Sequence, residues 1–332
     1  MLIRVTYPVP PEARLVLRTD ANWDLDVAPR RVEGACAWFE VDPAAPTLAV
    51  KPVLIQGAHV QWAKGPNYVL SQYEPDRAIW PFFFAEERGR ISPVEHVAFD
   101  GLTMAMRIYY PAGYDENTER RFPVTYMQDG NNLFFPDEAF LGNDWRVDET
   151  MDRLDQMNAI RKTVVIGISP ADRMRDYTRP GYEAYGRFLV QHLKPLIDAR
   201  VRTRPGPHET AVMGSSLGGV AALYLAWQYP TVVGRAACLS STFGVMDDLF
   251  TRIATEPKRD IVVYLDSGWP RDNFEATNAM RDLLMLRGYQ LGVDLLQFSF
   301  PEGTHHEQSW AARLHLPFQF FFGRAWCAAR DG

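Results

Sequence analysis

The sequence that decides the fold is Thr210-Ala-Val-Met-Gly-Ser-Ser-Leu-Gly-Gly-Val-Ala-Ala-Leu-Tyr-Leu, residues 210–225. A short apolar run leads through a turn of small residues into helix-forming sequence, and residues 214–218 match the pattern G-x-S-x-G around Ser216. A serine in a strained turn between a strand and a helix needs neighbours without Cβ atoms, which explains the glycines. Such a turn points the first N–H groups of the helix, beginning near Leu217, at the place where an oxyanion would form.

The pattern alone is weak evidence for a catalytic serine, because on the order of one in ten chains of this length would contain it by chance. Its setting is more specific. Residues 211–213 are typical of a buried strand end, and residues 220–227 are typical of a helix that stops at Tyr229-Pro230. This is the setting that a nucleophilic serine requires, so we expect Ser216 to be a nucleophile rather than a solvated turn residue.

The composition is that of an ordinary soluble protein with one large domain and one smaller one. The chain has 332 residues, 47% of them apolar, and a net charge of −6. No basic block is long enough to follow a phosphate backbone, which argues against a nucleic-acid partner. No stretch approaches the roughly 18 apolar residues of a membrane span, and the first residues lack a signal-peptide core, so we predict a cytoplasmic protein with no membrane partner. The oligomeric state stays open, with a homodimer as one candidate.

The cysteines argue against a disulfide framework. Cys36, Cys238 and Cys327 are odd in number and far apart in the sequence. They form neither a paired framework nor a metal-binding knuckle, so we expect small buried apolar residues.

The sequence pattern differs between the first and the second part of the chain. Residues 1–88 contain short β-like runs between Pro, Gly, Asn and Asp, which predicts a small β-sandwich domain. Residues 89–332 alternate strands with helices, which predicts an α/β domain with a mostly parallel sheet covered on both faces. Four tryptophans of the first part could form a stacking platform for a sugar or aryl group, although core filling and contact with the second domain are favoured: Trp23, Trp38, Trp62 and Trp80.

A serine nucleophile needs a base, and the best candidates follow the last predicted strand. His305 and His306 lie in Pro301-Glu-Gly-Thr-His-His, at the rim where open α/β sheets bind ligands. A histidine pair could instead bind a metal, but no third ligand has a familiar spacing and neither H-E-x-x-H nor C-x-x-C occurs. We therefore expect neither a metal nor a cofactor.

The base needs an acid to fix its tautomer and to stabilise its cation. Asp266, Asp272 and Glu275 all follow the predicted strand at residues 260–265. Asp272 is favoured because it lies in the loop before the next helix, although it could equally cap that helix. Asp266 stays open as the alternative acid.

A second oxyanion donor should follow the third strand of the α/β domain. Gly130 lets the backbone turn in Met127-Gln-Asp-Gly-Asn-Asn, which frees the N–H group of Asn131. Arg173 and Arg175 could clamp an anionic substrate, although pairing with surface acids is slightly favoured. Aromatic residues near predicted strand ends are candidates for the substrate pocket or for the core: Phe134, Phe135, Trp145, Tyr182 and Trp269.

Five segments together carry a family resemblance. They are Tyr126-Met-Gln-Asp-Gly-Asn-Asn-Leu-Phe, Arg175-Asp-Tyr, Phe188-Leu-Val-Gln-His-Leu-Lys-Pro-Leu-Ile-Asp, Met213-Gly-Ser-Ser-Leu-Gly-Gly, and a histidine five residues before Trp310. Over residues 91–322 the chain resembles the esterase family of α/β-hydrolases that includes esterase D, enterochelin esterases, feruloyl esterase domains and mycolyltransferase antigens.

The resemblance implies an α/β-hydrolase fold and a role for each matching residue. It implies Ser216 as the nucleophile, His305 as the base and the amide of Asn131 in the oxyanion hole, and it supports Asp272 as the acid. The first part of the chain resembles the β-sandwich modules that precede the hydrolase domain of enterochelin-esterase-like proteins, but it is shorter here.

These observations predict a serine hydrolase of carboxylic esters that works through an acyl-enzyme and a Ser-His-Asp triad. Its partner would be a small-molecule ester with an aryl or a sugar group. Two alternatives within enzymes are hydrolysis of a siderophore lactone and acyl transfer to a sugar or alcohol. A third, from another class, is a carbohydrate-binding module on an inactive hydrolase scaffold.

Overall fold

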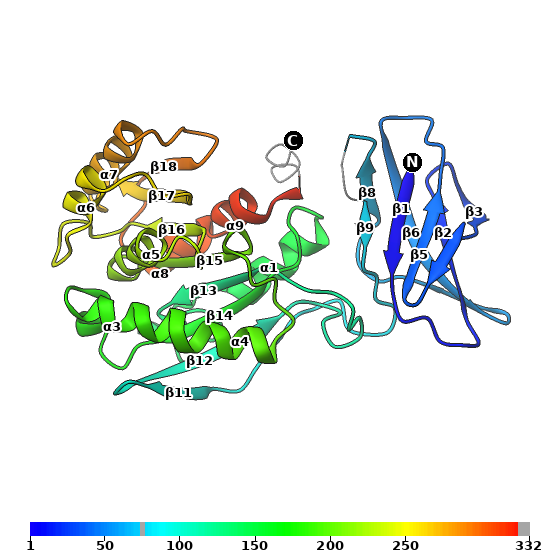
Figure 1. Ribbon diagram of the computed structural model, residues 1–332, viewed down its shortest axis with the longest axis horizontal. Coiled ribbons are helices and arrows are strands. Elements are labelled where there is room, and N and C mark those ends of the chain that lie inside the picture. Colours follow the sequence, from blue (N-terminus) through cyan, green and yellow to red (C-terminus); the bar gives the residue numbers. More distant parts are fainter. Residues whose placement is uncertain (74–76, 325–332) are drawn as a thin grey trace.

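The computed structural model describes residues 1–73 and 77–324. It has a β-only part at one end and a larger α/β part at the other (Figure 1). This arrangement confirms the predicted fold class, an α/β sheet preceded by a β-sandwich. The domain boundary near residue 88 stays a prediction, and Cys327 lies outside the described residues.

The β-only part consists of two sheets that face each other. One sheet has the strand order β4-β5-β1-β9, and the other has β3-β2-β6-β7 with β8 also paired to β6. Apolar side chains from both sheets, among them Val5, Phe39, Leu17 and Val50, are fully buried in one shared core. The strands are β1 (Leu2–Thr6), β2 (Arg14–Thr19), β3 (Asn22–Val27), β4 (Arg31–Glu33), β5 (Cys36–Glu40), β6 (Thr47–Gln56), β7 (His59–Trp62), β8 (Tyr68–Ser71) and β9 (Ala78–Ile79).

The four tryptophans of this part are half-buried rather than core residues. The guanidinium of Arg18 lies 5.0 Å from the ring centre of Trp62, and that of Arg31 lies 4.0 Å from Trp38. Trp80 also faces Arg120 of the larger part, at 5.7 Å. The expected contact between the two parts is therefore observed at Trp80. The expected core filling is seen in part, because Trp62 packs against the buried cluster of Val16, Val53 and Ile55.

A mixed sheet runs through the α/β part. Its order is β10-β12-β14-β13-β15-β16-β17-β18, with β11 paired to β12, and all strands from β13 onward run parallel. Their carboxyl ends consequently lie along one edge, where the candidate site forms. The strands are β10 (Arg90–Ile91), β11 (Glu95–Phe99), β12 (Leu102–Tyr110), β13 (Val124–Gln128), β14 (Val164–Ser169), β15 (Thr210–Ser215), β16 (Arg235–Leu239), β17 (Val262–Trp269) and β18 (Leu295–Pro301).

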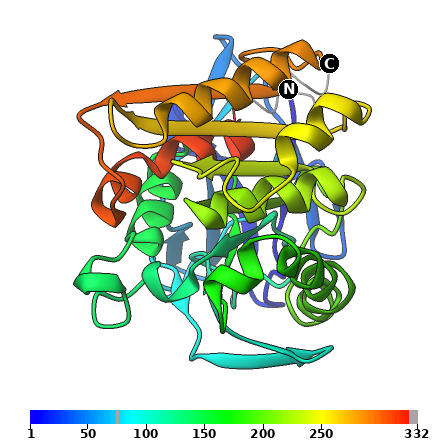
Figure 2. The same cartoon turned by 90° about the vertical axis from the view of Figure 1, so that its left-hand side faces the viewer.

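Helices cover both faces of this sheet, as Figure 2 shows. Each face of the sheet has its own hydrophobic core, and alternate side chains of β14 point into one or the other. Val164 and Ile166 pack with α3 to α7, whereas Val165 packs with α1, α8 and α9. Because these strands are buried on both faces, their sequences are continuous apolar runs. The helices are α1 (Val147–Gln156), α2 (Arg173–Tyr177), α3 (Gly181–Arg187), α4 (Lys194–Arg200), α5 (Leu217–Gln228), α6 (Leu249–Thr255), α7 (Phe274–Leu286), α8 (Glu307–Arg313) and α9 (His315–Phe322).

From the sequence alone we predict one helix at residues 182–201 and a closing helix at residues 307–322, but the structure interrupts each of them near a proline. Between α3 and α4 the chain widens into a π-helical turn over Phe188–Leu193, because Pro195 has no N–H group to donate to the carbonyl of Gln191. The predicted closing helix at residues 307–322 is wrong as one element, since it divides into α8 and α9 just before Pro317.

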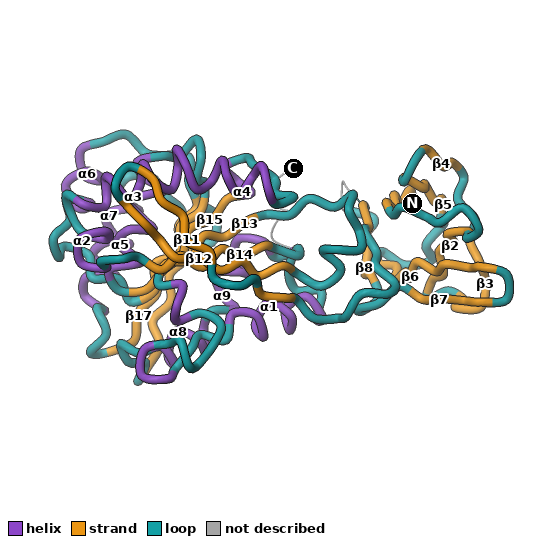
Figure 3. The backbone as a smooth tube through the Cα atoms, turned by 90° about the horizontal axis from the view of Figure 1, so that it is seen from below, coloured by secondary structure: helices purple, strands orange, loops and turns teal. Residues whose placement is uncertain are grey.

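A carboxylate fastens the β-sandwich to the α/β part, and Figure 3 shows the connecting segments seen from below. Glu116 accepts hydrogen bonds from the backbone N–H groups of Phe83, Phe84 and Ala85 at 2.6, 2.8 and 2.7 Å, and from the Tyr7 hydroxyl at 2.9 Å. Residues 79–89 are too apolar for a flexible linker, which predicts a connector held between the two parts. The contacts of Glu116 hold it in this way.

We expect Glu116→Ala to lower the free energy of unfolding by about 1–3 kcal/mol, because three backbone donors lose a charged acceptor. Urea unfolding would measure the loss, and hydrogen exchange should accelerate at residues 83–85. Glu119→Ala is the matched control, since Glu119 is exposed. Equal stability of the two variants would show that the carboxylate does not fasten the connector.

Among the described residues, no helix is both long and apolar enough to cross a membrane. The cytoplasmic location and the oligomeric state stay predictions.

Candidate active site

Ser216 lies in a strained turn between β15 and α5. Its backbone has φ 54° and ψ −124°, a combination that non-glycine residues rarely adopt and that costs about 1–3 kcal/mol. The turn needs its glycines, because a Cβ atom on Gly214 would lie 2.6 Å from the backbone carbonyl of Gly218, and one on Gly218 would lie 3.0 Å from Gln128 Cβ. The sequence pattern therefore corresponds to a real steric requirement.

We expect Gly214→Ala to destabilise the protein by about 1–3 kcal/mol, since the added methyl group meets backbone that has to move. A shifted turn also displaces Ser216, so any hydrolytic activity should fall with the melting temperature. Gly206→Ala is the matched control, because a Cβ atom there would have no neighbour within 4 Å. If both variants melt and react like the wild type, the turn does not need its first glycine.

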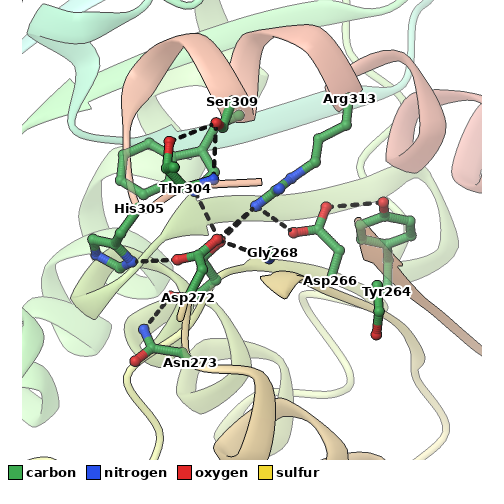
Figure 4. Close-up of polar contacts among 12 residues, drawn as sticks. Tyr264, Asp266, Gly268, Asp272, Asn273, Thr304, His305, Ser309 and Arg313 are labelled. Atoms are coloured by element: carbon green, nitrogen blue, oxygen red, sulfur yellow. Dashed lines mark hydrogen bonds and ion pairs between the residues drawn. The ribbon is translucent and has the colours of Figure 1, made fainter. Parts of the chain in front are cut away.

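His305 and Asp272 form a hydrogen-bonded pair (Figure 4). His305 Nδ1 lies 2.7 Å from Asp272 Oδ1. The loop after β18 provides the histidine and the loop after β17 provides the carboxylate, so two neighbouring parallel strands bring them together. Trp310 packs edge-on against the imidazole at 5.0 Å and limits its rotation. Because Nδ1 is bonded to the carboxylate, Nε2 is the ring nitrogen left for proton transfer.

Asp272 is held as a charged carboxylate. Burial by itself would raise its pKa, but hydrogen bonds from His305, Ser240 and the N–H group of Gly268 outweigh burial and lower the pKa below its ordinary value. The Ser240 hydroxyl donates to Oδ2 at 2.5 Å and accepts from Trp310 Nε1 at 3.0 Å. This carboxylate can therefore stabilise an imidazolium beside it.

The segment Leu239–Thr242 at the end of β16 links Ser216 to the His305–Asp272 pair. The N–H group of Ser216 donates to the carbonyl of Leu239 at 3.0 Å, and Ser240 contacts Asp272. Among the described residues, Ser216 and His305 share no hydrogen bond of 3.5 Å or less. In proteins without substrate such bonds are often long and tighten only when substrate binds.

Asp266, the alternative acid, lies deeper in the protein and contacts other groups. Arg313 approaches Oδ1 at 3.0 Å, and the Tyr264 hydroxyl donates to Oδ2 at 2.9 Å. Burial raises the pKa of Asp266 to about 6, although Arg313 and Tyr264 oppose the shift. The structure thus places Asp272, rather than Asp266, against His305.

The second candidate base has a structural role. His306 caps the first turn of α8, where its Nδ1 accepts from the N–H group of Gln308 at 3.2 Å. His192 stacks on Phe99 at 4.7 Å between ring centres, so this histidine has a packing role away from the site.

The two proposed oxyanion donors lie at the ends of adjacent strands. Leu217 is the first residue of α5, where N–H groups have no acceptor within the helix. Asn131 lies in a 3-10 turn, Gly130–Asn132, that follows β13. Asp129, which comes just before this turn, has a left-handed backbone with φ 55°. The glycine is required, because a Cβ atom at that position would lie 2.5 Å from the backbone of Gly167.

The pocket candidates separate into core residues and rim residues. Phe134, Trp145 and Tyr182 have at most 5% of their surface exposed and belong to the hydrophobic core. Trp269, at the end of β17, is 49% exposed beside the edge of Phe274. Arg173 and Arg175 pair with Asp129 and Asp176, as the favoured pairing predicted, but both acids are buried rather than on the surface.

Sequence reasoning missed the polar groups behind the pair. Ser240 and Arg313 contact the carboxylate of Asp272, at 2.5 and 3.5 Å, from segments distant in the chain. No short motif contains them, so only the fold could identify them. Trp310 was noticed as part of a motif, but its contact with His305 was not expected.

Within residues 1–73 and 77–324, no group of three or more His, Cys, Asp or Glu side chains is arranged to hold a metal ion.

Comparisons with known proteins identify relatives of the α/β part. Residues 101–319, which are 219 of the 332 residues, match the family described as "Putative esterase". The uncharacterized protein YbbA of Bacillus subtilis is 25% identical over 150 residues. That match covers 41% of this chain and 56% of YbbA, so the chain spans little more than half of this relative's length.

Solved structures share the fold. A ferulic acid esterase has a TM-score of 0.60 at 14% identity, covering 71% of this chain and 98% of its own. The enterobactin esterase of Shigella flexneri, solved in the presence of 2,3-dihydroxy-N-benzoyl-glycine, has a TM-score of 0.55 at 12% identity over 96% of this chain and 92% of its own. Together, the family match and the architecture show that the chain belongs to this esterase family and has the α/β-hydrolase fold.

Proposed function

We propose that the protein is a serine hydrolase of carboxylic esters in which Ser216, His305 and Asp272 act as a catalytic triad. The observation that carries the proposal is the 2.7 Å contact between His305 Nδ1 and the buried Asp272. The strained turn that holds Ser216 is linked to this pair through residues 239 and 240. Membership of the esterase family supports ester chemistry.

Each residue then has one step to perform. Ser216 Oγ attacks the ester carbonyl carbon while His305 Nε2 takes its proton, and Asp272 stabilises the imidazolium. The N–H groups of Leu217 and Asn131 hold the oxygen that becomes negative. Collapse breaks the bond to the alcohol, which leaves with the proton from His305. Water then attacks the acyl-enzyme by the same route and regenerates Ser216.

We propose an ester with an aryl group as the substrate. The half-exposed Trp269 and its neighbour Phe274 lie next to the loop that carries Asp272, where a planar ring could pack. A similar fold in a ferulic acid esterase agrees with this choice. A panel of feruloyl, p-nitrophenyl and acetylated-sugar esters, with a catecholate trilactone and an added acceptor alcohol, would separate aryl ester hydrolysis from lactone hydrolysis and acyl transfer.

Covalent labelling tests the proposal most directly. A fluorophosphonate should attach to the peptide that contains Ser216, and mass spectrometry of that peptide should show the added mass. Ser216→Ala should abolish labelling, whereas Ser215→Ala, its matched control, should retain it. An intact wild-type protein that stays unlabelled would instead support a carbohydrate-binding module on an inactive scaffold.

A further inference from the structure

Arg173 joins two backbone segments that are distant in the sequence. From the start of α2, its Nε and Nη2 atoms donate to the two carboxylate oxygens of Asp129 at 2.9 and 3.1 Å. Nη2 also donates to the carbonyl of Ser215 at 3.3 Å. The planar guanidinium fixes both the distance and the angle of such a two-bond contact.

Both segments precede a proposed oxyanion donor by two residues. Asp129 precedes Asn131, and Ser215 precedes Leu217. The Asp129 carboxylate also lies close to α5, since a Cβ atom on Gly218 would be 3.2 Å from Oδ2. One side chain therefore connects the peptide after β13 with the peptide after β15.

The same helix makes a second contact with Asp129. The backbone N–H group of Asp129 donates to the Tyr177 hydroxyl at 3.0 Å, and Tyr177 is completely buried. Arg173 and Tyr177, at the two ends of α2, thus hold the side chain and the backbone of one residue. Burial raises the pKa of Asp129, and the ion pair with Arg173 opposes that shift.

We propose that Arg173 is a positioning residue that keeps the amides of Asn131 and Leu217 at the spacing an oxyanion needs, through its contacts with Asp129 and Ser215. This inference rests on the proposed hydrolase function. It differs from an anion clamp for substrate, because two of the guanidinium nitrogens are already bonded to the protein.

The two roles predict different kinetics. A displaced amide weakens binding of the transition state but not of the substrate, so Arg173→Lys should lower kcat by about 10- to 100-fold for every ester and leave KM nearly unchanged. The inhibition constant of a boronic acid, which forms a tetrahedral adduct with serine, should rise by the same factor. A substrate clamp would instead raise KM, and only for anionic esters.

The experiment compares Arg173→Lys, Arg173→Met and the double variant Arg173→Met/Asp129→Asn with Arg175→Met, an exposed arginine of the same helix. The lysine variant keeps the charge and the double variant removes both charges, so at least one should fold, as thermal unfolding would verify. Guanidinium at low millimolar concentration should partly restore kcat of Arg173→Met.

Two results would overturn the proposal: folded variants with wild-type kcat, or a loss confined to KM for anionic esters. Wild-type protein that is not labelled at Ser216 would refute the hydrolase function itself. Labelled wild-type protein with unaffected variants would refute only the role of Arg173.

Discussion

Replacing Ser216 by alanine is expected to lower kcat for ester hydrolysis by a factor on the order of 10⁶, the size of loss known for a triad nucleophile. The variant retains the His305–Asp272 pair and both proposed amides, but it has no oxygen that can form an acyl-enzyme. Initial rates with a p-nitrophenyl ester, measured at high enzyme concentration, would quantify the loss.

Ser215→Ala provides the comparison for this experiment, because it removes a hydroxyl one residue away at a site that is also buried. It should keep kcat within a few-fold of the wild type. If Ser216→Ala retained more than a tenth of the wild-type rate, another group would have to be the nucleophile.

Replacing Asp272 by asparagine is expected to lower kcat by about 10⁴-fold at neutral pH. The amide has nearly the shape of the carboxylate, but its NH₂ group is a donor and cannot accept the hydrogen bond that His305 Nδ1–H donates. The imidazole then favours the wrong tautomer, and its cation loses the charge that stabilises it. Steady-state kinetics would test this, with Asp282→Asn, an exposed aspartate of α7, as the control.

The choice between the two candidate acids depends on the same measurement. If kcat of Asp272→Asn fell by less than tenfold, Asp272 would not be the acid of the triad. Asp266→Asn is expected to affect kcat less, because Asp266 contacts Arg313 and Tyr264 rather than His305.

Asp272 should also make stability depend on pH in a defined direction. Its pKa is lower in the folded protein than in the unfolded chain, so its stabilising effect is present above about pH 4 and is lost as the pH falls further. The difference in melting temperature between wild type and Asp272→Asn should therefore shrink between about pH 5 and pH 3. The raised pKa of Asp266 acts in the opposite direction, but burial, which is its main cause, is the same in both proteins. A constant difference over this range would contradict the lowered pKa.

Local sequence predicted most of the fold because the buried parallel strands have strong signals. The apolar runs at residues 124–128 and 262–266 lie in the sheet, as expected, because both of their faces are covered. The short helices α2 and α6 have too few residues to show a period and were not predicted. The divisions at Pro195 and Pro317 could have been predicted, since proline cannot donate the backbone hydrogen bond that continues a helix.

The sequence by itself determined the strained serine, the order of strands along the chain and the residue types of a triad, because these depend on spacing and on the absence of Cβ atoms. Only the tertiary structure decided that Asp272 rather than Asp266 contacts His305, and that Ser240, Arg313 and Arg173 surround the site. The physical reason is that side-chain partners meet through the lateral order of strands and the path of loops, which bring together residues from distant parts of the chain.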